Sequence, residues 1–236
     1  MKPQTFVRHL SSARYEHVFN PYTDRCHLHD RSDAAEVRRR NLRLLLEAAL
    51  ESGTDTIWVA RDLGYRGGRR TGVALTDDVH LASMSRLFGG VPLDRPTRGD
   101  VVAERTAAVI WRVLMKIDQP IFLWNVFPFH PHEPENDFSN RCHTRSERDS
   151  SLPFLYALIE MLAPKRLIAI GRDAQQALSG VDIEVIGVRH PSYGGQRDFL
   201  NGVCAAHSVG IDEDADAEQM SFMEGGQAAS AGSAAA

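Results

Sequence analysis

Four short runs of apolar residues punctuate the middle of the chain and predict β-strands. Each run is continuous rather than alternating, and each is rich in β-branched or aromatic residues. That pattern is typical of strands whose two faces are both buried, as in the sheet of an α/β protein. The predicted strands are 56–60, 121–125, 166–170 and 184–188, and the first two place Trp58 and Trp124 in the expected core.

Stretches with helical character separate these strands, at 100–117, 152–162 and 173–178. Strands that alternate with helices indicate a parallel sheet that helices cover on both faces. We therefore expect an α/β fold, a three-layer α/β/α sandwich around a short, mainly four-stranded parallel sheet.

A further helix is predicted at 34–53, ahead of the first strand. Ser32 or Asp33 is placed to cap its start, and Gly53 is placed to end it. Its leucines form a stripe for the core, and its arginines favour a solvated helix face. The leucines are Leu42, Leu44, Leu45, Leu46 and Leu50, and the arginines are Arg38, Arg39, Arg40 and Arg43.

In parallel sheets the functional side chains lie just beyond the carboxyl ends of the strands. The first strand is followed by a segment, 61–72, that holds four glycines and four arginines. Glycines let the backbone approach a ligand closely, and arginines offer contacts to phosphate. The segment has neither the GK[ST] ending of a phosphate-binding P-loop nor a GxGxxG pattern.

Two other strand ends carry candidate chemistry. Asn125 ends the second strand, where its amide offers a donor and an acceptor to a planar heterocycle or ties two loops together. After the fourth strand, the prolines and glycines of Arg189-His190-Pro191-Ser192-Tyr193-Gly194-Gly195 shape a turn that presents His190 and Tyr193.

The net charge of −4 over 236 residues divides unevenly along the chain. The segment 211–236 contains six acidic and no basic residues, so the segment 1–210 carries 27 − 25 = +2. The basic residues are 24 Arg and 3 Lys, and Arg is the better partner for phosphates and bases. We expect one α/β domain over 1–210, with its core at roughly 50–205, and an acidic, disordered tail over 211–236.

Composition excludes several other classes. The chain has no run of about 18 apolar residues, so we expect no membrane span. The N-terminal residues lack the apolar region of a secretory signal, and three scattered cysteines are too few for a disulfide framework. We therefore expect a cytoplasmic protein. We also expect it to be a monomer and to need no cofactor.

Three motifs carry a resemblance to a known family. ARDLGYRGG follows the first strand, FLWN ends a middle strand, and RHPSYGG comes late in the chain. In this order, over roughly 50–205, the chain resembles the uracil-DNA glycosylase superfamily. The resemblance implies an enzyme that binds single- or double-stranded DNA and flips out a pyrimidine. The enzyme then hydrolyses the N-glycosidic bond and leaves an abasic site.

The resemblance also implies residue roles. Asp62 takes the place of the Asp that orients the attacking water and stabilises the sugar cation. Asn125 takes the place of the base-reading amide, and His190 that of the His that hydrogen-bonds the base O2. The reaction needs these groups because it creates an oxocarbenium-like sugar and an anionic base. The resemblance also places Ser192 and Tyr193 in a loop at the DNA. Apart from the resemblance, Arg66, Arg69 and Arg70 are expected to contact phosphates, and Tyr65 either lines the pocket or merely covers the sheet.

The chain departs from the family pattern at positions that determine which base is accepted as substrate. Leu63 replaces a common Pro, and Leu75 replaces an aromatic residue that stacks on the base. Gly64 stands where uracil-strict members have a bulky Tyr against the base C5. Either this glycine leaves room for a 5-substituted pyrimidine, or neighbouring side chains refill the gap and uracil is the substrate. The first reading suggests antiviral defence against phage DNA with hypermodified cytosine, and the second suggests base-excision repair.

Two other classes of function stay open. Soft ligands could form a zinc site, in a metal-dependent hydrolase or a structural module that binds nucleic acid. They are Cys26, His27 and His29 together with Cys142 and His143. Against a metal, CxxC and HExxH spacings are absent, and an iron–sulfur cluster needs four cysteines. A protein of the same fold that binds DNA without cleaving it is the other alternative.

Overall fold

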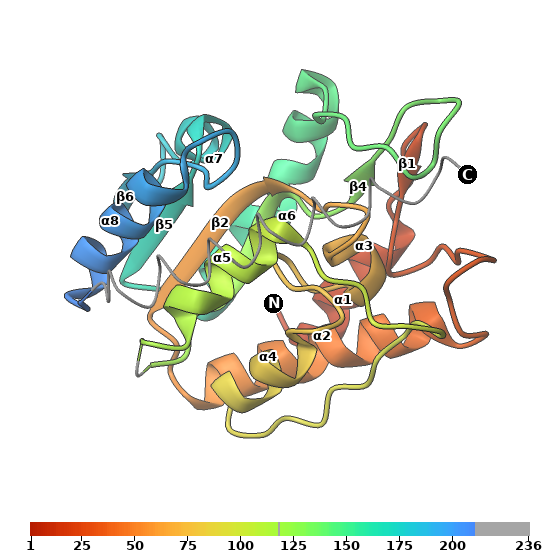
Figure 1. Ribbon diagram of the computed structural model, residues 1–236, viewed down its shortest axis with the longest axis horizontal. Helices are drawn as coiled ribbons and strands as arrows, with labels where there is room; N and C mark the ends of the chain where they lie inside the picture. Colours follow the sequence, from red (N-terminus) through yellow and green to blue (C-terminus); the bar gives the residue numbers. More distant parts are fainter. Residues whose placement is uncertain (118, 211–236) are drawn as a thin grey trace, which may run out of the picture.

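Four apolar segments pair into one sheet in which every neighbouring pair of strands is parallel (Figure 1). The computed structural model describes residues 1–117 and 119–210. In spatial order the strands are β3 (Phe122–Phe127), β2 (Thr56–Asp62), β5 (Arg166–Ile170) and β6 (Glu184–Val188). β2 therefore lies inside the sheet, between β3 and β5.

All four predicted strands are confirmed, and β5 and β6 have the predicted bounds. β2 and β3 each run two residues further than predicted, because Asp62 still pairs with Phe127. Trp58 and Trp124 are buried as expected. The expectation of burial on both faces is wrong for β6, an edge strand in which only Val188 is buried.

The three predicted helices between the strands are confirmed with shifted bounds. They are α5 (Arg105–Leu114), α6 (Arg145–Leu162) and α7 (Arg172–Ala177). α6 begins well before 152 because Thr144 and Glu147 form a capping box at its start. The Glu147 N–H donates to the Thr144 hydroxyl at 3.2 Å, and the Thr144 N–H donates to the Glu147 carboxylate at 2.6 Å.

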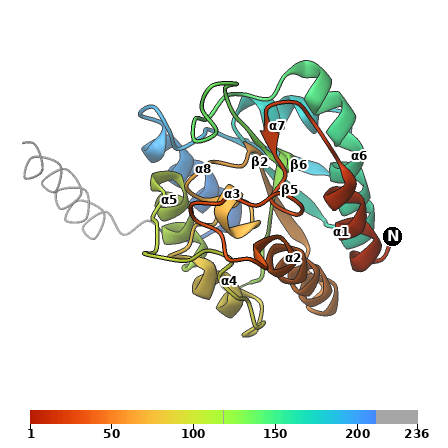
Figure 2. The ribbon, with the colours of Figure 1, turned by 90° about the vertical axis from the view of Figure 1, so that its right-hand side faces the viewer.

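Helices cover the sheet on both faces, which confirms the three-layer sandwich (Figure 2). α5 and α8 (Gln196–His207) lie on one side, and α1 (Pro3–Ser12) and α6 lie on the other. Neither α1 nor α8 was expected from the sequence pattern. α4 (Leu81–Leu87) and the single-turn α3 (Gly68–Thr71) complete the described helices together with α2 (Ala34–Glu51).

A small second sheet ties the N-terminal segment to the chain beyond β3. β1 (Val18–Phe19) pairs antiparallel with β4 (His130–Pro131). β4 follows β3 after two residues, so the pairing brings the N-terminal segment to the carboxyl end of the main sheet.

The predicted helix at 34–53 is confirmed as α2. Asp33 stands at the N-cap position, but its carboxylate pairs with Arg31 at 2.9 Å instead of capping the helix. Gly53 follows the helix with a φ of 62°, a conformation that glycine adopts without strain. Leu42, Leu45 and Leu46 are buried, whereas Leu50 is exposed.

Arg38 is not on a solvated face, which corrects the interpretation of the α2 arginines. Its Nη1 donates to Asp30 at 3.0 Å, and only 1% of either side chain is exposed. Its Nε donates to the carbonyl oxygen of Arg70 at 2.7 Å, and its stem packs against Gly72. A buried charge needs such partners, and here they join α2 to the glycine-rich segment after β2. Arg39, Arg40 and Arg43 are partly or fully exposed, as expected.

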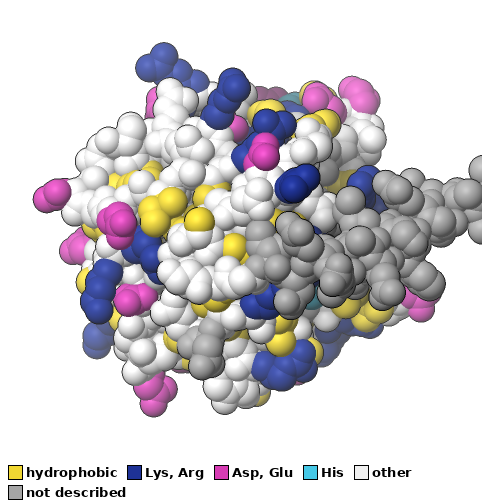
Figure 3. Space-filling view, turned by 60° about the vertical axis from the view of Figure 1, so that its left-hand side comes forward, with side chains coloured by type: hydrophobic (Ala, Val, Ile, Leu, Met, Phe, Trp, Pro, Cys, Tyr) yellow, Lys and Arg dark blue, Asp and Glu magenta, His cyan; other side chains and the backbone are white. Residues whose placement is uncertain are grey.

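The described surface mixes both signs of charge. On the face in Figure 3, Lys and Arg side chains are interspersed with Asp and Glu, and hydrophobic atoms show as small areas between them. Over the described residues, no helix is both long and apolar enough to cross a membrane. The predicted acidic tail, 211–236, lies outside the described residues.

We predict that Arg38→Ala lowers the free energy of unfolding by about 3–5 kcal/mol, because it leaves Asp30 charged and buried without its partner. Arg40→Ala is the matched control in the same helix. Its pair with Asp94 is solvent-exposed, so its loss should cost about 0–1 kcal/mol. Urea unfolding followed by circular dichroism measures both values, and equal losses for the two variants would contradict the role assigned to Arg38.

Candidate active site

The strand register brings the predicted strand ends to one edge of the sheet. Along β2 and β3, Ala60 pairs with Asn125 and Asp62 pairs with Phe127. Along β5 and β6, Ile170 pairs with Val188, two residues before His190. All four strands are parallel, so Asp62, Asn125 and the His190 turn belong to the same edge.

Asp62 is a nearly buried carboxylate held by two donors. Only 6% of its side chain is exposed. Arg61 Nε donates to Oδ2 at 2.7 Å, and the Nδ1–H of His143 donates to Oδ1. Because burying an ionised carboxylate is costly without hydrogen bonds, these two partners account for its stability there. Each oxygen keeps a second lone pair for another donor, such as a water molecule.

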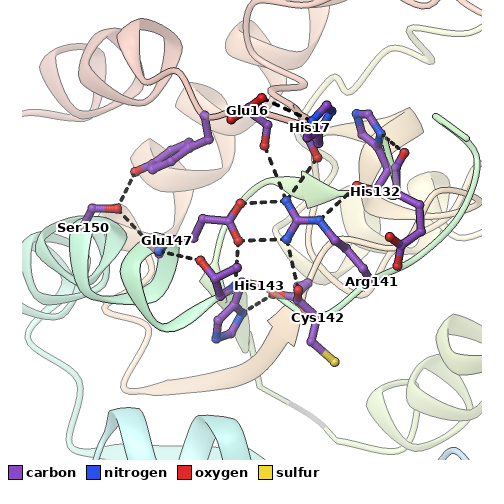
Figure 4. Close-up of polar contacts among 12 residues, drawn as sticks. Glu16, His17, His132, Arg141, Cys142, His143, Glu147 and Ser150 are labelled. Atoms are coloured by element: carbon purple, nitrogen blue, oxygen red, sulfur yellow. Dashed lines mark hydrogen bonds and ion pairs between the residues drawn. The ribbon is translucent and has the colours of Figure 1, made fainter. Parts of the chain in front are cut away.

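His143 reaches Asp62 because an ion pair holds its segment over the end of the sheet (Figure 4). Arg141 donates to both carboxylate oxygens of Glu147, at 2.7 and 2.8 Å. A bidentate pair of this kind fixes orientation as well as distance. Arg141 Nε also donates to the carbonyl of His132 at 2.9 Å. The pair joins the segment before α6 to the first turn of that helix, with His143 between them.

Arg61 links Asp62 to Asp173, which follows the neighbouring strand β5. Its Nη1 lies 3.7 Å from a carboxylate oxygen of Asp173, near the start of α7. Its side chain is 40% exposed, so one side of the guanidinium faces solvent. At the carboxyl edge of the sheet, the positive charge of Arg61 therefore lies between two negative charges. These are Asp62 at the end of β2 and Asp173 after the neighbouring strand β5.

Asn125 has a fully buried side chain with one half of its amide unused. Its Nδ2 donates to the backbone carbonyl of Asp62 at 3.0 Å. Its Oδ1 is buried and accepts no hydrogen bond from any described residue. Buried polar atoms without a partner are rare, so this oxygen is a candidate acceptor for an N–H group of a ligand.

His190 is a neutral imidazole that offers one N–H. The Ser192 N–H donates to its Nδ1 at 3.2 Å, so the ring proton is on Nε2. Burial, together with the charge of Arg61, lowers the pKa of His190 below its ordinary value of 6.5, while Asp173 opposes this shift. At neutral pH the residue is therefore an uncharged hydrogen-bond donor.

The turn after His190 projects a fully exposed aromatic ring. Tyr193 is 100% exposed and has a φ of 53°, a left-handed conformation unusual for a residue with a side chain. The turn is closed by a hydrogen bond from the Gly195 N–H to the Ser192 carbonyl at 3.1 Å. Pro191 is buried and anchors the turn, so Ser192 and Tyr193 are the parts that face outward.

The space beside Gly64 is not open, because Glu104 fills it. A Cβ placed on Gly64 would lie 2.5 Å from the Glu104 carboxyl, and one on Gly67 would also collide with that group. Of the two interpretations of Gly64, the structure agrees with the one in which a neighbouring side chain refills the gap: the wall there is a carboxyl group from the residue before α5.

Two of the three arginines expected at DNA are buried. Arg70 is paired with Asp78 at 2.7 Å, and Arg69 lies between the rings of Phe19 and Phe138, at 4.1 and 4.9 Å. Their burial does not agree with direct contacts to phosphate, because their charged ends hold the protein's own segments together. Arg66 alone among the three is exposed.

The other two predicted pocket residues differ in exposure. Tyr65 is half-buried, and its hydroxyl accepts a hydrogen bond from Arg66 Nε at 2.7 Å. Leu75 is nearly buried and has a φ of 54°, and its carbonyl accepts the Trp111 Nε1–H at 3.2 Å. Leu75 therefore packs into the core beside the site, in a backbone conformation held by Trp111.

The structure does not assemble the alternative metal site. Within the residues that it describes, no group of three or more His, Cys, Asp or Glu side chains is arranged to hold a metal ion. His143 pairs with Asp62 instead, and Cys26 and Cys142 are free thiols.

Three residues of the site were not expected in it from the sequence. The sequence pattern presents Arg61 only as one arginine of the loop after the first strand, and His143 only as a candidate zinc ligand. His143 lies 81 residues from its partner Asp62. Glu104 lies in a segment without a motif, and no local pattern connects it to Gly64. Contacts of this kind arise from the packing of distant segments, so a single sequence carries no signal for them.

Residues 40–203 match the Uracil DNA glycosylase superfamily. Among solved structures, the fold is similar to the crystal structure of wild-type SMUG2 from Pedobacter heparinus, with a TM-score of 0.59. That similarity covers 87% of this chain and 97% of the other chain at 12% sequence identity, and it therefore concerns the fold alone. The sequence matches none of the curated proteins with which it was compared.

We predict that His190 titrates below pH 6.5 and carries its proton on Nε2 at neutral pH, because it is partly buried near the charge of Arg61 and accepts the Ser192 N–H on Nδ1. Nitrogen-15 NMR of labelled histidines measures both the titration and the tautomer, and a His190→Asn variant assigns the signal. A midpoint at or above 6.5, or an Nδ1–H tautomer, would contradict the geometry described for the turn.

Proposed function

The chain belongs to the uracil DNA glycosylase superfamily, and from that premise we propose that it is a DNA glycosylase. It flips a pyrimidine nucleotide out of the stack, hydrolyses the N-glycosidic bond and leaves an abasic site. The reaction breaks the bond between C1′ and the base nitrogen, with the electron pair leaving on the base. Water supplies the hydroxyl group on C1′, and the proton that water loses neutralises the released base.

The nearly buried carboxylate of Asp62 is the observation that carries this proposal. Cleavage develops positive charge on the sugar, and a fixed negative group next to that charge stabilises the transition state. Arg61 and His143 hold the carboxylate in place before the substrate arrives, so little reorganisation is needed during the reaction. One of its free lone pairs serves to orient the attacking water.

Asn125 and His190 suit the two sides of the departing base. The unpartnered Oδ1 of Asn125 accepts an N–H of the base edge, which fixes the orientation of the pyrimidine. The Nε2–H of neutral His190 donates to the base O2, where negative charge develops as the bond breaks. A neutral donor performs this task without placing a positive charge near the sugar cation.

Exposed side chains beside the site can contact the DNA backbone and fill the gap that the flipped base leaves in the base stack. Tyr193 is the wedge candidate, because its exposed ring projects from a turn that Pro191 anchors. Ser192 and the exposed Arg66 are candidate phosphate contacts. Arg69 and Arg70 support the loop from within and are not proposed as contacts.

The choice of base is made at the wall beside Gly64, where the Glu104 carboxyl group lies. We propose a 5-substituted pyrimidine, such as a hypermodified cytosine of phage DNA, with a role in antiviral defence. Uracil in base-excision repair is the competing substrate, and it is favoured by the observation that Glu104 narrows the space next to Gly64. Measuring base release from oligonucleotides that contain uracil or 5-hydroxymethylcytosine distinguishes the two substrates.

We predict that Asp62→Asn lowers the rate of base release by about 10²–10⁴-fold, because it removes the negative charge while keeping the shape of the side chain. Asp55→Asn is the matched control, at the opposite end of β2. The assay incubates each protein with oligonucleotides containing uracil or 5-hydroxymethylcytosine and cleaves abasic sites with alkali. The control should keep the rate of the wild-type protein.

Two outcomes would overturn this assignment. An unchanged rate for Asp62→Asn would remove the carboxylate from the mechanism. Binding of DNA by the wild-type protein without release of any base would favour a DNA-binding module that does not cleave.

A further inference from the structure

The carboxyl group of Glu104 lies against the segment that follows Asp62. It occupies the positions that side chains at Gly64 and Gly67 would take, with Oε1 2.5 Å from a Cβ placed on Gly64. Gly64 is only two residues beyond Asp62. Glycine at these two positions therefore gives the carboxyl group access to the edge of the sheet that holds the site.

The backbone of Glu104 is held in place from the other side. Its N–H donates to a carboxylate oxygen of Asp77 at 2.7 Å. The other oxygen of Asp77 accepts hydrogen bonds from the backbone and the ring of His80, at 2.9 and 2.6 Å. This network fixes where α5 begins, and the side chain of Glu104 extends from that fixed point towards Gly64.

The Glu104 carboxyl has no partner of its own. Among the described residues, none forms a hydrogen bond or ion pair with it. Burial, together with the nearby charge of Asp77, raises the pKa of Glu104 to about 7, although Arg66 opposes the shift. The carboxyl oxygens are not among the buried atoms that lack a partner, so water reaches them, and a ligand that displaces this water can supply a donor in its place.

Asn125 provides a second, independent observation at the same segment. Its Nδ2 is bound to the carbonyl of Asp62, and its buried Oδ1 has no donor among the described residues. An unused amide oxygen and an unused carboxyl group thus lie next to the segment 62–64. Both are acceptors when Glu104 is ionised, and together they favour a ligand edge that is rich in N–H or O–H donors.

We propose that Glu104 selects the base, by accepting a hydrogen bond from a donor on the 4,5 edge of the pyrimidine. The substrate class is a cytosine, with its 4-amino group, whose C5 substituent carries a hydroxyl. Carboxylates recognise the cytosine amino group in this way, whereas uracil and thymine present the acceptor O4 at the same position. This inference rests on the proposed glycosylase function and names its substrate.

The charge of Glu104 makes the selection depend on pH. Below about pH 7 the protonated carboxyl can donate to O4 of uracil, and above it the carboxylate can only accept. The charged groups that face it are Arg66 from the segment after β2 and Asp77 from the segment before α4, with His80 behind Asp77. Preference for the cytosine over uracil should therefore rise as pH increases through about 7.

The test compares kcat/KM for oligonucleotides that contain 5-hydroxymethylcytosine, cytosine, uracil or thymine. In the wild-type protein the first should be released fastest. In Glu104→Gln the ratio of 5-hydroxymethylcytosine to uracil should fall by about 5- to 150-fold, the discrimination that one good base contact supplies. Gly64→Ala should change it in the same direction, because the new Cβ displaces the carboxyl. Glu36→Gln, at an exposed glutamate in the first turn of α2, is the matched control and should leave the ratio unchanged.

An unchanged ratio in Glu104→Gln, with bases still released, would overturn this inference and leave the proposed function intact. Failure of the wild-type protein to release any base would overturn both. If the variants do not fold, the wild-type protein alone provides the test. A ratio of kcat/KM for 5-hydroxymethylcytosine to kcat/KM for uracil that stays constant between about pH 6 and pH 8 also refutes the role of Glu104.

Discussion

The burial of one negative charge at the end of β2 organises the region that we propose to be catalytic. Asp62 is nearly removed from water, and an ionised carboxylate is tolerated there only with hydrogen-bond donors. One donor is its chain neighbour Arg61, and the other is His143, from the segment before α6. That segment therefore has to cross the end of the sheet, and the Arg141–Glu147 pair holds it there.

The distribution of satisfied and unsatisfied polar groups separates support from function. Arg38 and Arg70 are buried with their carboxylate partners, and both connect the glycine-rich segment to the body of the protein. Asn125 Oδ1 and the Glu104 carboxyl have no such partners among the described residues. Because both acceptors lie next to the segment that follows Asp62, a ligand bound there can provide donors to both.

The sheet was predictable because a strand buried on both faces has a local signature. β5 and β6 were identified residue by residue, and β2 and β3 to within two residues at their carboxyl ends. Helix boundaries were less accurate, since the start of α6 depends on a capping box that its apolar pattern does not reveal. α1 lies ahead of all the strands, and α8 contains Gly202, a residue that weakens the helical pattern of its segment.

Sequence patterns were enough to place the four strands and the helices between them, and hence to assign Asp62, Asn125 and His190 to strand ends at one edge. This was possible because a strand end is a local property and parallel strands share their carboxyl edge. Tertiary packing, by contrast, brings His143 to Asp62 and Glu104 to Gly64, and it buries Arg69 and Arg70. These contacts join segments far apart in the chain, and their formation depends on how the layers pack rather than on any local pattern.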